Sequence, residues 1–496
     1  MNKLFYVIMF GLMLNGINTE DLDDWQQYRH DPQHTSYTDS DLPENLFLTW
    51  EHKVKLPSIG EDEAETFKIY SEAQTTYHRE KLFFAWEDSL FVFNPDTGRI
   101  IWSYSHNEPV LSPWIGPVDE INGIANYEDL VVATFLNGDL IVFNEENGNI
   151  FWEKNFSSPF SGESLGIPII EDGIIYVVAN ERIDIPQKPV LFSIKIENGD
   201  INWNFTGKIT LITPSVSKEK VYLQDSDNLY ALDKRTGEVI WSIPSQLFLF
   251  LDKVISQNKR VFIQKTPGPF IGSPHILCLD AENGREIWKL ETNEGIAAVH
   301  GSHLLLGKRI VDIETGGEIL SLNKNEIGED FFHSKIWARK KILLFGRKKT
   351  KNLMHILILY DLEKKTVIWK YEREDIYFIS SIIAGNKLFT GTSDGRILAF
   401  TDPESLIPRA DKYMKEKDYE SALFLYEKAR EYYEEEGNSD KIKEIEEKIG
   451  EITEESEKTR PKEETKIKQI LIGGLGFIAL MVLIIYFRRK KSQVKK

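Results

Sequence analysis

Apolar and polar positions alternate in short runs along most of the chain, and one turn pattern interrupts them repeatedly. In residues 229–241, LYALDKRTGEVIW, an apolar run is followed by Asp-Lys-Arg-Thr-Gly and then by a second apolar run that ends in tryptophan. Alternation with a period of two indicates strands, and a glycine-containing turn between two such runs indicates a β-hairpin. The pattern therefore predicts an all-β body built from antiparallel hairpins.

Five copies of this hairpin share one spacing, in which a glycine precedes a tryptophan by four residues. The pairs are Gly98 and Trp102, Gly148 and Trp152, Gly199 and Trp203, Gly237 and Trp241, and Gly284 and Trp288. Two weaker copies end at Leu320 and Trp369. Glycine supplies the positive backbone angle of the turn, and the tryptophan buries a large rigid surface whose ring nitrogen needs a partner.

Polar residues four positions before the glycine complete the turn pattern in four copies. They are Asn94, Asn144, Asp233 and Asp280, whose side chains can accept hydrogen bonds from the turn backbone. In the last weak copy Lys365 stands where glycine is expected, so we expect that turn to be built differently.

The spacing of the copies identifies the repeating unit. From Trp102 to Trp369 the anchors fall 50, 51, 38, 47, 32 and 49 residues apart, which is typical of a four-stranded propeller blade. Residues 381–402 give three more strands without a tryptophan strand, and Trp50 lies about one blade before Trp102. We therefore predict an eight-bladed β-propeller over residues 24–402, in which the N-terminal strand completes the last blade and removes an open edge. A seven-bladed ring is the alternative, because the 32-residue interval ending at Leu320 is short.

The repeat resembles that of the pyrroloquinoline-quinone-like, or quinoprotein-like, propellers, which has the form A-x-D-x-x-T-G-x-x-x-W and is matched by YALDKRTGEVIW. Residues 23–43, DDWQQYRHDPQHTSYTDSDLP, are similar to the segment that precedes the first blade in that family. In its enzymes the resemblance implies an axial quinone and a calcium ion held by Glu, Asn and Asp, an Asp base, a stacking Trp and a disulfide between adjacent cysteines. No stretch matches those ligands, and Cys278 is the sole cysteine. We expect no catalytic residue, cofactor or metal.

Charge and cysteine content narrow the classes of partner. The formal net charge of −18 argues against a nucleic-acid partner, which needs a basic footprint. Cys278 lies in the apparent strand HILCLD and is expected to be a small buried hydrophobe rather than a nucleophile.

Both ends of the chain carry membrane-directed patterns. Residues 1–19 read as a signal peptide, whose cleavage the sequence leaves open. Residues 470–487 are uncharged and long enough to form a transmembrane helix, and the basic residues 488–496 are expected to be a cytoplasmic tail. The propeller would then be extracytoplasmic at the cell membrane, where the sequons at Asn155 and Asn204 are candidate glycosylation sites.

Helical periodicity begins after Pro408. Residues 408–450 weakly resemble a tetratricopeptide helix pair, and residues 451–468 read as a charged helical spacer. A single helix pair cannot bury both of its faces, so this segment should pack on the propeller, on another chain or on a partner.

Three further groups were weighed as sites. His300 and His303 have a spacing seen in metal sites but fit a solvated turn better, and His30 and His34 fit a structural role. Asp225 and Asp227 lack the glycine and the closing glutamate of a calcium loop, so they fit a strand turn.

The expected function is a non-enzymatic, membrane-anchored extracytoplasmic propeller that binds an unknown protein or glycan. The alternatives are a quinone-dependent dehydrogenase, or a component of cell-envelope assembly or a sensor. Residues 180–189 and 264–275 depart from the repeat and are where a ligand is expected first.

Overall fold

The computed structural model divides into two compact units, Met1–Pro403 and Glu404–Lys496, called here the propeller unit and the helical unit. The residues that it describes are 24–54, 75–106, 111–112, 116–117, 120–156, 164–180, 188–208, 211–225, 227–244, 254–265, 273–322, 327, 333–349, 353–374 and 376–459. The predicted signal peptide, transmembrane helix and cytoplasmic tail lie outside these residues.

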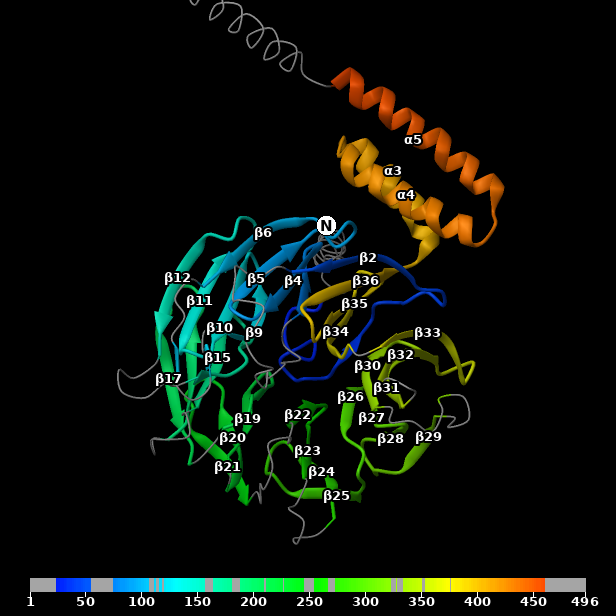
Figure 1. The fold of residues 1–496 in the computed structure, drawn as a ribbon. Helices are drawn as coiled ribbons and strands as arrows, with labels where there is room; N and C mark the ends of the chain where they lie inside the picture. The colour runs from blue at the N-terminus through cyan, green and yellow to red at the C-terminus, as the bar shows by residue number, and fades with distance from the viewer. Residues whose placement is uncertain are drawn as a thin grey trace, which may run out of the picture. The chain divides into compact units, whose positions relative to one another are not determined.

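Eight antiparallel sheets are arranged in a ring in the propeller unit (Figure 1). The strands of blades 1 to 4 are β3 (Thr75–His78), β4 (Lys81–Trp86), β5 (Ser89–Phe93), β6 (Ile100–Ser105), β9 (Ile121–Tyr127), β10 (Leu130–Phe135), β11 (Asp139–Asn144), β12 (Ile150–Asn155), β13 (Ser164–Leu165), β14 (Ile169–Glu171), β15 (Ile174–Asn180), β16 (Val190–Lys195), β17 (Ile201–Thr206), β18 (Ser215–Val216), β19 (Lys220–Gln224), β20 (Asn228–Asp233) and β21 (Val239–Pro244). Blade 3 has five strands, because β13 and β14 both pair with β15.

The second half of the ring has the same order in blades 5 to 7, whereas blade 8 takes its outermost strand, β2, from the N-terminal region. The strands of blades 5 to 8 are β22 (Val254–Gln257), β23 (Arg260–Lys265), β24 (His275–Asp280), β25 (Glu286–Glu291), β26 (Ile296–His300), β27 (His303–Leu306), β28 (Arg309–Asp312), β29 (Glu318–Ser321), β30 (His333–Ala338), β31 (Lys341–Lys349), β32 (Leu353–Asp361), β33 (Thr366–Glu374), β34 (Phe378–Ala384), β35 (Lys387–Thr392), β36 (Arg396–Thr401) and β2 (Phe47–Lys53). A two-residue strand, β1 (Tyr37–Thr38), pairs in parallel with β30, and β7 (Leu111–Ser112) pairs with β8 (Gly116–Pro117).

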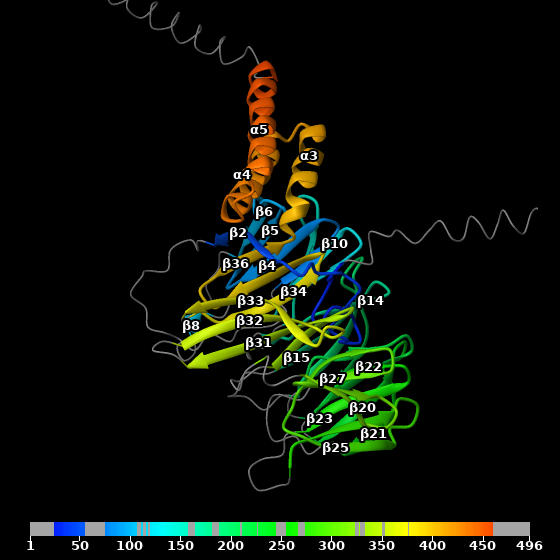
Figure 2. The ribbon, with the colours of Figure 1, turned by 90° about the vertical axis from the view of Figure 1, so that its right-hand side faces the viewer.

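The ring closes through the N-terminal strand. β2 pairs with β36 as the outermost strand of blade 8, and the two strands lie side by side in both views (Figures 1 and 2). The prediction of eight blades completed by the strand of Trp50 is confirmed. The short interval ending at Leu320 still holds a full four-stranded blade 6, so the seven-bladed alternative is wrong.

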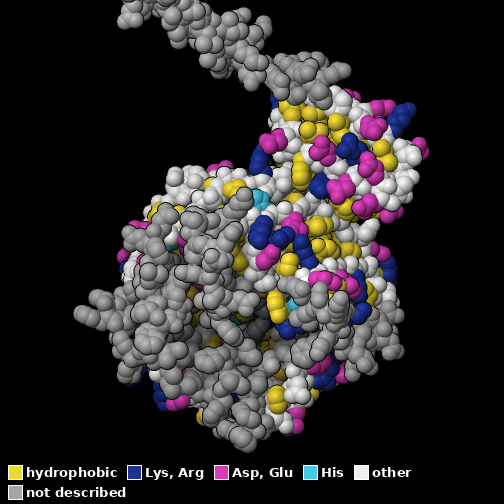
Figure 3. Space-filling model, viewed as in Figure 1, with side chains coloured by type: hydrophobic (Ala, Val, Ile, Leu, Met, Phe, Trp, Pro, Cys, Tyr) yellow, Lys and Arg dark blue, Asp and Glu magenta, His cyan; other side chains and the backbone are white. Residues whose placement is uncertain are grey.

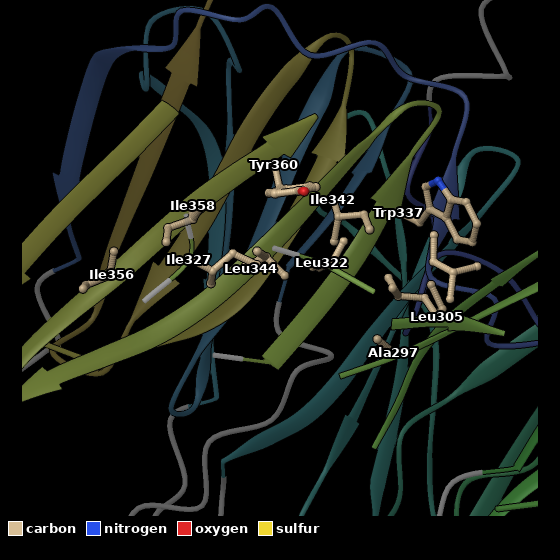
Figure 4. Close-up of a cluster of buried hydrophobic side chains, with 12 residues drawn as sticks. Ala297, Leu305, Leu322, Ile327, Trp337, Ile342, Leu344, Ile356, Ile358 and Tyr360 are labelled. Carbon is tan, nitrogen blue, oxygen red and sulfur yellow. The ribbon is translucent and has the colours of Figure 1, made fainter. Parts of the chain in front are cut away.

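The hydrophobic core is distributed between the blades. Six clusters of buried side chains each join two neighbouring blades, from blades 1 and 2 through blades 6 and 7. Figure 4 shows the cluster between blades 6 and 7, where Leu305 from β27 lies near Trp337 from β30 and Ile342 from β31. The middle strands are buried on both faces, which explains continuous apolar runs such as LVVATF in β10.

The repeated tryptophans connect each blade to the next. The indole nitrogen of Trp203 in blade 3 donates to the Lys234 carbonyl oxygen in the turn of blade 4 at 3.0 Å, and its ring covers Gly237. The same arrangement joins Trp50, Trp102, Trp152, Trp241 and Trp288 to Gly98, Gly148, Gly199, Gly284 and Gly316. Trp369 donates to the Leu46 carbonyl oxygen at 2.8 Å, just before β2, so blade 7 holds the start of the closing strand.

The interface between blades 6 and 7 has neither the tryptophan nor the glycine of the other interfaces. Leu320 occupies the tryptophan position of β29, and Lys365 occupies the glycine position of the turn in blade 7. Lys365 has φ +55°, within the left-handed region that the glycines use, so the expectation that this turn is built differently is wrong. Because a leucine replaces the bulkier indole, a side chain at the turn is tolerated.

A β-bulge precedes the anchor residue in all eight blades. In blade 1, Val92 pairs with Trp102 and Phe93 with Ile100, so Ile101 has no partner on the neighbouring strand. The corresponding register shifts occur in the other seven blades. Bulges bend an edge strand and interrupt its free hydrogen-bonding groups, so they protect the outer edges from pairing with another chain.

The helical unit contains α3 (Leu406–Glu416), α4 (Tyr419–Glu435) and α5 (Ser439–Thr459) after a short 3-10 turn, η2 (Pro403–Ser405). Asp411 of α3 accepts hydrogen bonds from Tyr426 of α4 and Lys448 of α5, and these outweigh the effect of burial and lower its pKa. Acidic and basic side chains are interspersed on the face of this unit seen in Figure 3. Among the described residues, no helix has the length and apolar composition needed to cross a bilayer.

Replacing Gly237 by alanine is expected to destabilise the propeller by about 3 kcal/mol, because the substitution combines overpacking with left-handed backbone strain. A Cβ there would lie 2.5 Å from Cε3 of Trp203, at φ +74°. Gly301→Ala is the matched control, since it has φ +57° but no atom within 4 Å of the added Cβ. Urea unfolding followed by tryptophan fluorescence measures both, and equal losses of stability would show that the indole contact is unimportant.

Candidate functional site

The segment after residue 24 forms a ring of its own inside the propeller. Residues 25–40, called here the inner ring, contact the blades in chain order, with one hydrogen-bonded contact or more for each blade. The contacts are Trp25 with Tyr77, Gln26 with Asn126, Gln27 with Ile170, Pro32 with Val216, Gln33 with Ser256, Thr35 with Val299, Ser36 with Trp337 and Ser40 with Asn386. The inner ring therefore binds the innermost strands or turns of blades 1 to 8 in succession.

Tight curvature in the inner ring comes from residues other than glycine. Arg29, His30, His34 and Ser36 all have positive φ, from 51° to 83°. Such angles cost about 1–2 kcal/mol each for residues with a Cβ, so the surrounding contacts must hold them. His34 supplies one of these contacts, because its Nδ1 lies 3.1 Å from the Val254 carbonyl oxygen and its side chain is buried.

A small cavity lies where the inner ring meets blades 7 and 8. Trp25, Arg29 and Ser36 line this cavity of about 30 Å³ together with residues of those two blades. Arg29 is buried and donates to the carbonyl oxygens of His34 and Ala297. Small-molecule sites commonly have about 300–1,000 Å³, so this cavity is too small for a ligand of that class. The described residues include no group of three or more His, Cys, Asp or Glu that could hold a metal ion.

A buried charged cluster fastens the inner ring to blades 1 and 2. His78 Nδ1 lies 2.5 Å from Glu145 Oε2, and His78 Nε2 lies 3.5 Å from Asp24 Oδ2. Lys81 Nζ approaches the other oxygen of Glu145 at 3.5 Å. All three members of the Asp24, His78 and Glu145 group are less than a tenth exposed, so they form a structural tie rather than a site that substrate can reach.

Ion pairs also repeat between blades on the face that carries the inner ring. The first residue of the second strand in four blades pairs with an acid in the turn of the following blade. The pairs are Lys81 with Glu146, Lys220 with Glu282, Arg260 with Glu314 and Lys387 with Asp96. These pairs hold neighbouring blades together.

A cleft of about 550 Å³ opens between blades 4 and 5 on this face. Its floor includes Gln33 and Thr35 of the inner ring, one wall is the turn at residues 217–220, and the other is the turn at residues 256–260. Tyr222 lies beneath it with its hydroxyl donating to the Ala281 carbonyl oxygen at 3.4 Å, and burial raises the pKa of Tyr222 to about 12. The cleft is larger than the cavity beside Trp25 and Arg29 and has the volume of a ligand site, so it is the candidate site.

The histidines that were considered as metal ligands from the sequence lie partly on this face and partly in the interior. His30 lines the cleft and lies 3.4 Å from Asp31. His300 stacks on Tyr37 at 3.5 Å between ring centroids, and burial lowers its pKa. His303 lies on the same turn, and both rings contact the edge of Trp337. The structure places these rings in an aromatic cluster, without a third metal ligand among the described residues.

The other sequence candidates lie in structural positions. Asp225 is buried and accepts from the backbone of Asp227 and Asn228, while Asp227 pairs with Lys208. Asn155 and Asn204 lie on outer strands and are exposed. Most of the loops at residues 180–189 and 264–275 lies outside the described residues.

The comparisons with known proteins agree with this architecture. A family model described as outer membrane protein assembly factor BamB matches residues 87–248 and 212–329. Over these residues the chain is similar to the PQQ-like propeller repeat family. In the structure, the tryptophan of one repeat lies against the glycine of the next repeat, as Trp102 does against Gly148.

Solved structures match the PQQ-like propeller at low sequence identity. BamB from Moraxella catarrhalis has a TM-score of 0.51 and 12% identity, and the match covers 72% of this chain and 100% of that one. The computationally designed Ika8 protein also has a TM-score of 0.51 and 12% identity, covering 66% and 96%. These likenesses concern the fold. A search of curated protein sequences found no match.

Sequence reasoning missed the cleft and the path of the inner ring. The cleft combines residues far apart in the chain, such as Gln33, Lys218 and Lys259, and no motif connects them. The inner ring carried a partial signal, since Gln27, Arg29 and His34 are polar residues in a segment that lacks alternation.

Removing His78 is expected to leave two buried carboxylates without their shared partner. His78→Leu should lower the free energy of unfolding by about 3 kcal/mol, the usual cost of breaking a buried pair. The double variant His78→Leu with Glu145→Leu should regain part of the loss, because fewer buried charges remain unpaired. Chemical unfolding measures both variants, and a double variant less stable than the single one would contradict the role of the cluster.

Cys278 provides an internal probe of opening between blades 5 and 6. Its thiol is fully buried and donates to the Ile313 carbonyl oxygen, and burial raises its pKa from 9.0 to about 12. The native protein should therefore resist a thiol reagent at pH 8 and react after urea unfolding. The raised pKa adds stability below pH 9 that is lost as the pH rises toward 12. Rapid labelling of the folded protein would contradict this placement.

Proposed function

We propose that the protein is a non-enzymatic scaffold of the cell envelope whose propeller binds another protein. The family description, an outer membrane protein assembly factor, and the likeness of the fold to BamB support this assignment. In this proposal residues 1–19 direct export, residues 470–487 span the membrane once, and residues 488–496 face the cytoplasm. A component of envelope assembly is the role that these observations favour, ahead of a glycan receptor or a sensor.

The inner ring is the observation that carries the proposal. It binds all eight blades with the chain's own residues and leaves a cavity of only about 30 Å³ where it meets blades 7 and 8. A dehydrogenase of the related family would need a metal site beside an axial quinone, and the described residues include no group of three or more His, Cys, Asp or Glu that could hold a metal ion. The functional surface is then the outside of the propeller, where side chains differ between blades.

The helical unit fits the same proposal as a spacer with its own fold. Its three helices share the contacts of Asp411 with Tyr426 and Lys448, and α5 ends at Thr459. A tetratricopeptide-like pair formed by α3 and α4 is part of this proposal, with α5 covering one face of the pair. The weak helix-pair pattern and the contact between α4 and α5 support it.

A bifunctional reagent tests location and protein binding together. Asn204→Cys and Lys259→Cys place thiols on an exposed outer strand and an exposed turn, whereas the native Cys278 is buried. A membrane-impermeant maleimide that carries a photo-crosslinker should label both variants in intact cells, and light should then join at least one of them to the same protein repeatedly. The unsubstituted chain is the control and should remain unlabelled.

Two results would contradict the proposal. Labelling that requires cell lysis would place the propeller on the other side of the membrane. Turnover of an alcohol or a sugar by the full chain, after addition of quinone and calcium, would make it an enzyme. Absence of any adduct from both positions would remove the support for a protein partner at these two surfaces.

A further inference from the structure

The cleft between blades 4 and 5 has the dimensions of a ligand site and is lined mostly by residues with polar or charged side chains. Its volume of about 550 Å³ lies within the usual range for such sites. Two turns form its walls, and the inner ring forms its floor. Backbone contacts hold these parts in place, because the amides of Val216 and Ser256 donate to the carbonyl oxygens of Pro32 and Gln33.

Several charged side chains around the cleft already have partners within the protein. Lys220 is buried and pairs with Glu282 at 2.6 Å, and Arg260 pairs with Glu314. Asp31 accepts from the Thr35 amide and hydroxyl and lies beside His30, and these contacts outweigh the effect of burial and lower its pKa. These groups are satisfied within the protein and do not by themselves call for a ligand.

The charges that remain are mostly positive. Lys218 and Lys259 stand exposed on the two facing turns, and neither has an ion-pair partner among the described residues. Glu219, also exposed, is the acidic residue left beside them. The two ammonium groups therefore face the mouth of one cleft without a compensating carboxylate of their own. They favour a ligand with a carboxylate.

One donor and one acceptor on the lining also lack partners. Nε of Arg260 and Oε1 of Gln257 are buried atoms without a hydrogen bond in the described structure. An unpaired buried polar atom costs about 1–3 kcal/mol, so a ligand that supplies the missing acceptor and donor would bind more tightly. A peptide group has both, since its carbonyl oxygen accepts and its N–H donates.

The floor of the cleft is formed by backbone of the inner ring. The carbonyl oxygens of Pro32, Gln33 and Thr35 receive hydrogen bonds from Val216, Ser256 and Val299 of blades 4, 5 and 6. A ligand segment would lie over this part of the inner ring, between the two turns.

We propose that the cleft binds a short peptide segment of a partner protein through a carboxylate on that segment. The carboxylate lies between Lys218 and Lys259, and a peptide group pairs with Gln257 and Arg260. This inference rests on the proposed scaffold function and names the chemistry of the partner at one site.

Fluorescence anisotropy on the full chain in detergent tests the proposal. The probes are a fluorescein-labelled heptapeptide library with glutamate at the centre and mixed residues elsewhere, and the same library with glutamine. The glutamate library should bind at least about tenfold more tightly, because a charge-assisted hydrogen bond is about twice as strong as a neutral one. Salt should weaken its binding.

Matched variants separate the cleft from the general field of the protein. Lys218→Ala with Lys259→Ala should weaken binding of the glutamate library by about tenfold or more, since it removes both free cations. Arg285→Ala with Lys289→Ala removes the same charge from exposed positions around the outer strand of blade 5 and should leave binding unchanged. Gln257→Glu keeps the size of the side chain, adds a negative charge and should abolish binding.

Three outcomes would overturn the inference. Equal binding of the two libraries would show that the ligand carboxylate does not contribute. Equal loss of affinity in both double variants would show that the lysines act through the overall charge of the protein and not at the cleft. Tighter binding of an oligogalacturonate, lost in the Lys218 and Lys259 variant, would make the cleft a glycan site. If photo-crosslinks form in intact cells while the glutamate library does not bind, the scaffold function stands and this inference alone fails.

Discussion

The ring depends on the contact between a tryptophan of one blade and a glycine in the turn of the next. A single four-stranded blade cannot bury its faces, and the hydrophobic clusters all lie between neighbouring blades. The indole fills the outer part of such an interface and donates to a turn carbonyl oxygen, so its polar atom is satisfied. Glycine is required beneath it because a Cβ would overlap the ring. At one interface Leu320 stands in place of the tryptophan and Lys365 in place of the glycine. The tryptophan and the glycine are therefore replaced together.

A closed ring must also have the correct number of blades, and two parts of the N-terminal region contribute to this. β2 pairs with β36 and removes the free edge that the last blade would otherwise expose. The inner ring contacts the innermost strands or turns of all eight blades in order, so its length matches this blade number. Trp369 then joins blade 7 to Leu46 at the start of β2. Closure and filling of the axis are thus achieved by one continuous segment.

The turns between strands combine features that repeat in most blades with residues that differ from blade to blade. Ion pairs repeated between the blades satisfy many of the charges at the turns, and the bulges protect the outer edges. Against this regular background, the facing turns of blades 4 and 5 differ because Lys218 and Lys259 have no ion-pair partner among the described residues. Specific recognition by a propeller of this kind would come from such departures from the repeat.

The sequence alone indicated the repeat, the all-β class and the completion of the last blade by the strand of Trp50, because turn chemistry and anchor spacing are local and recur along the chain. It favoured eight blades but left seven open, and the four strands of blade 6 decided between them. It also indicated that Asp225 and His34 are structural. The backbone conformation at Lys365 could not be predicted from the sequence, because the space for its side chain depends on Leu320 in another blade. The cleft was equally hidden, because Gln33, Lys218 and Lys259 meet only when the inner ring passes the turns of two blades. Local hydrogen bonding and periodicity are encoded in neighbouring residues, whereas the site arises from long-range packing.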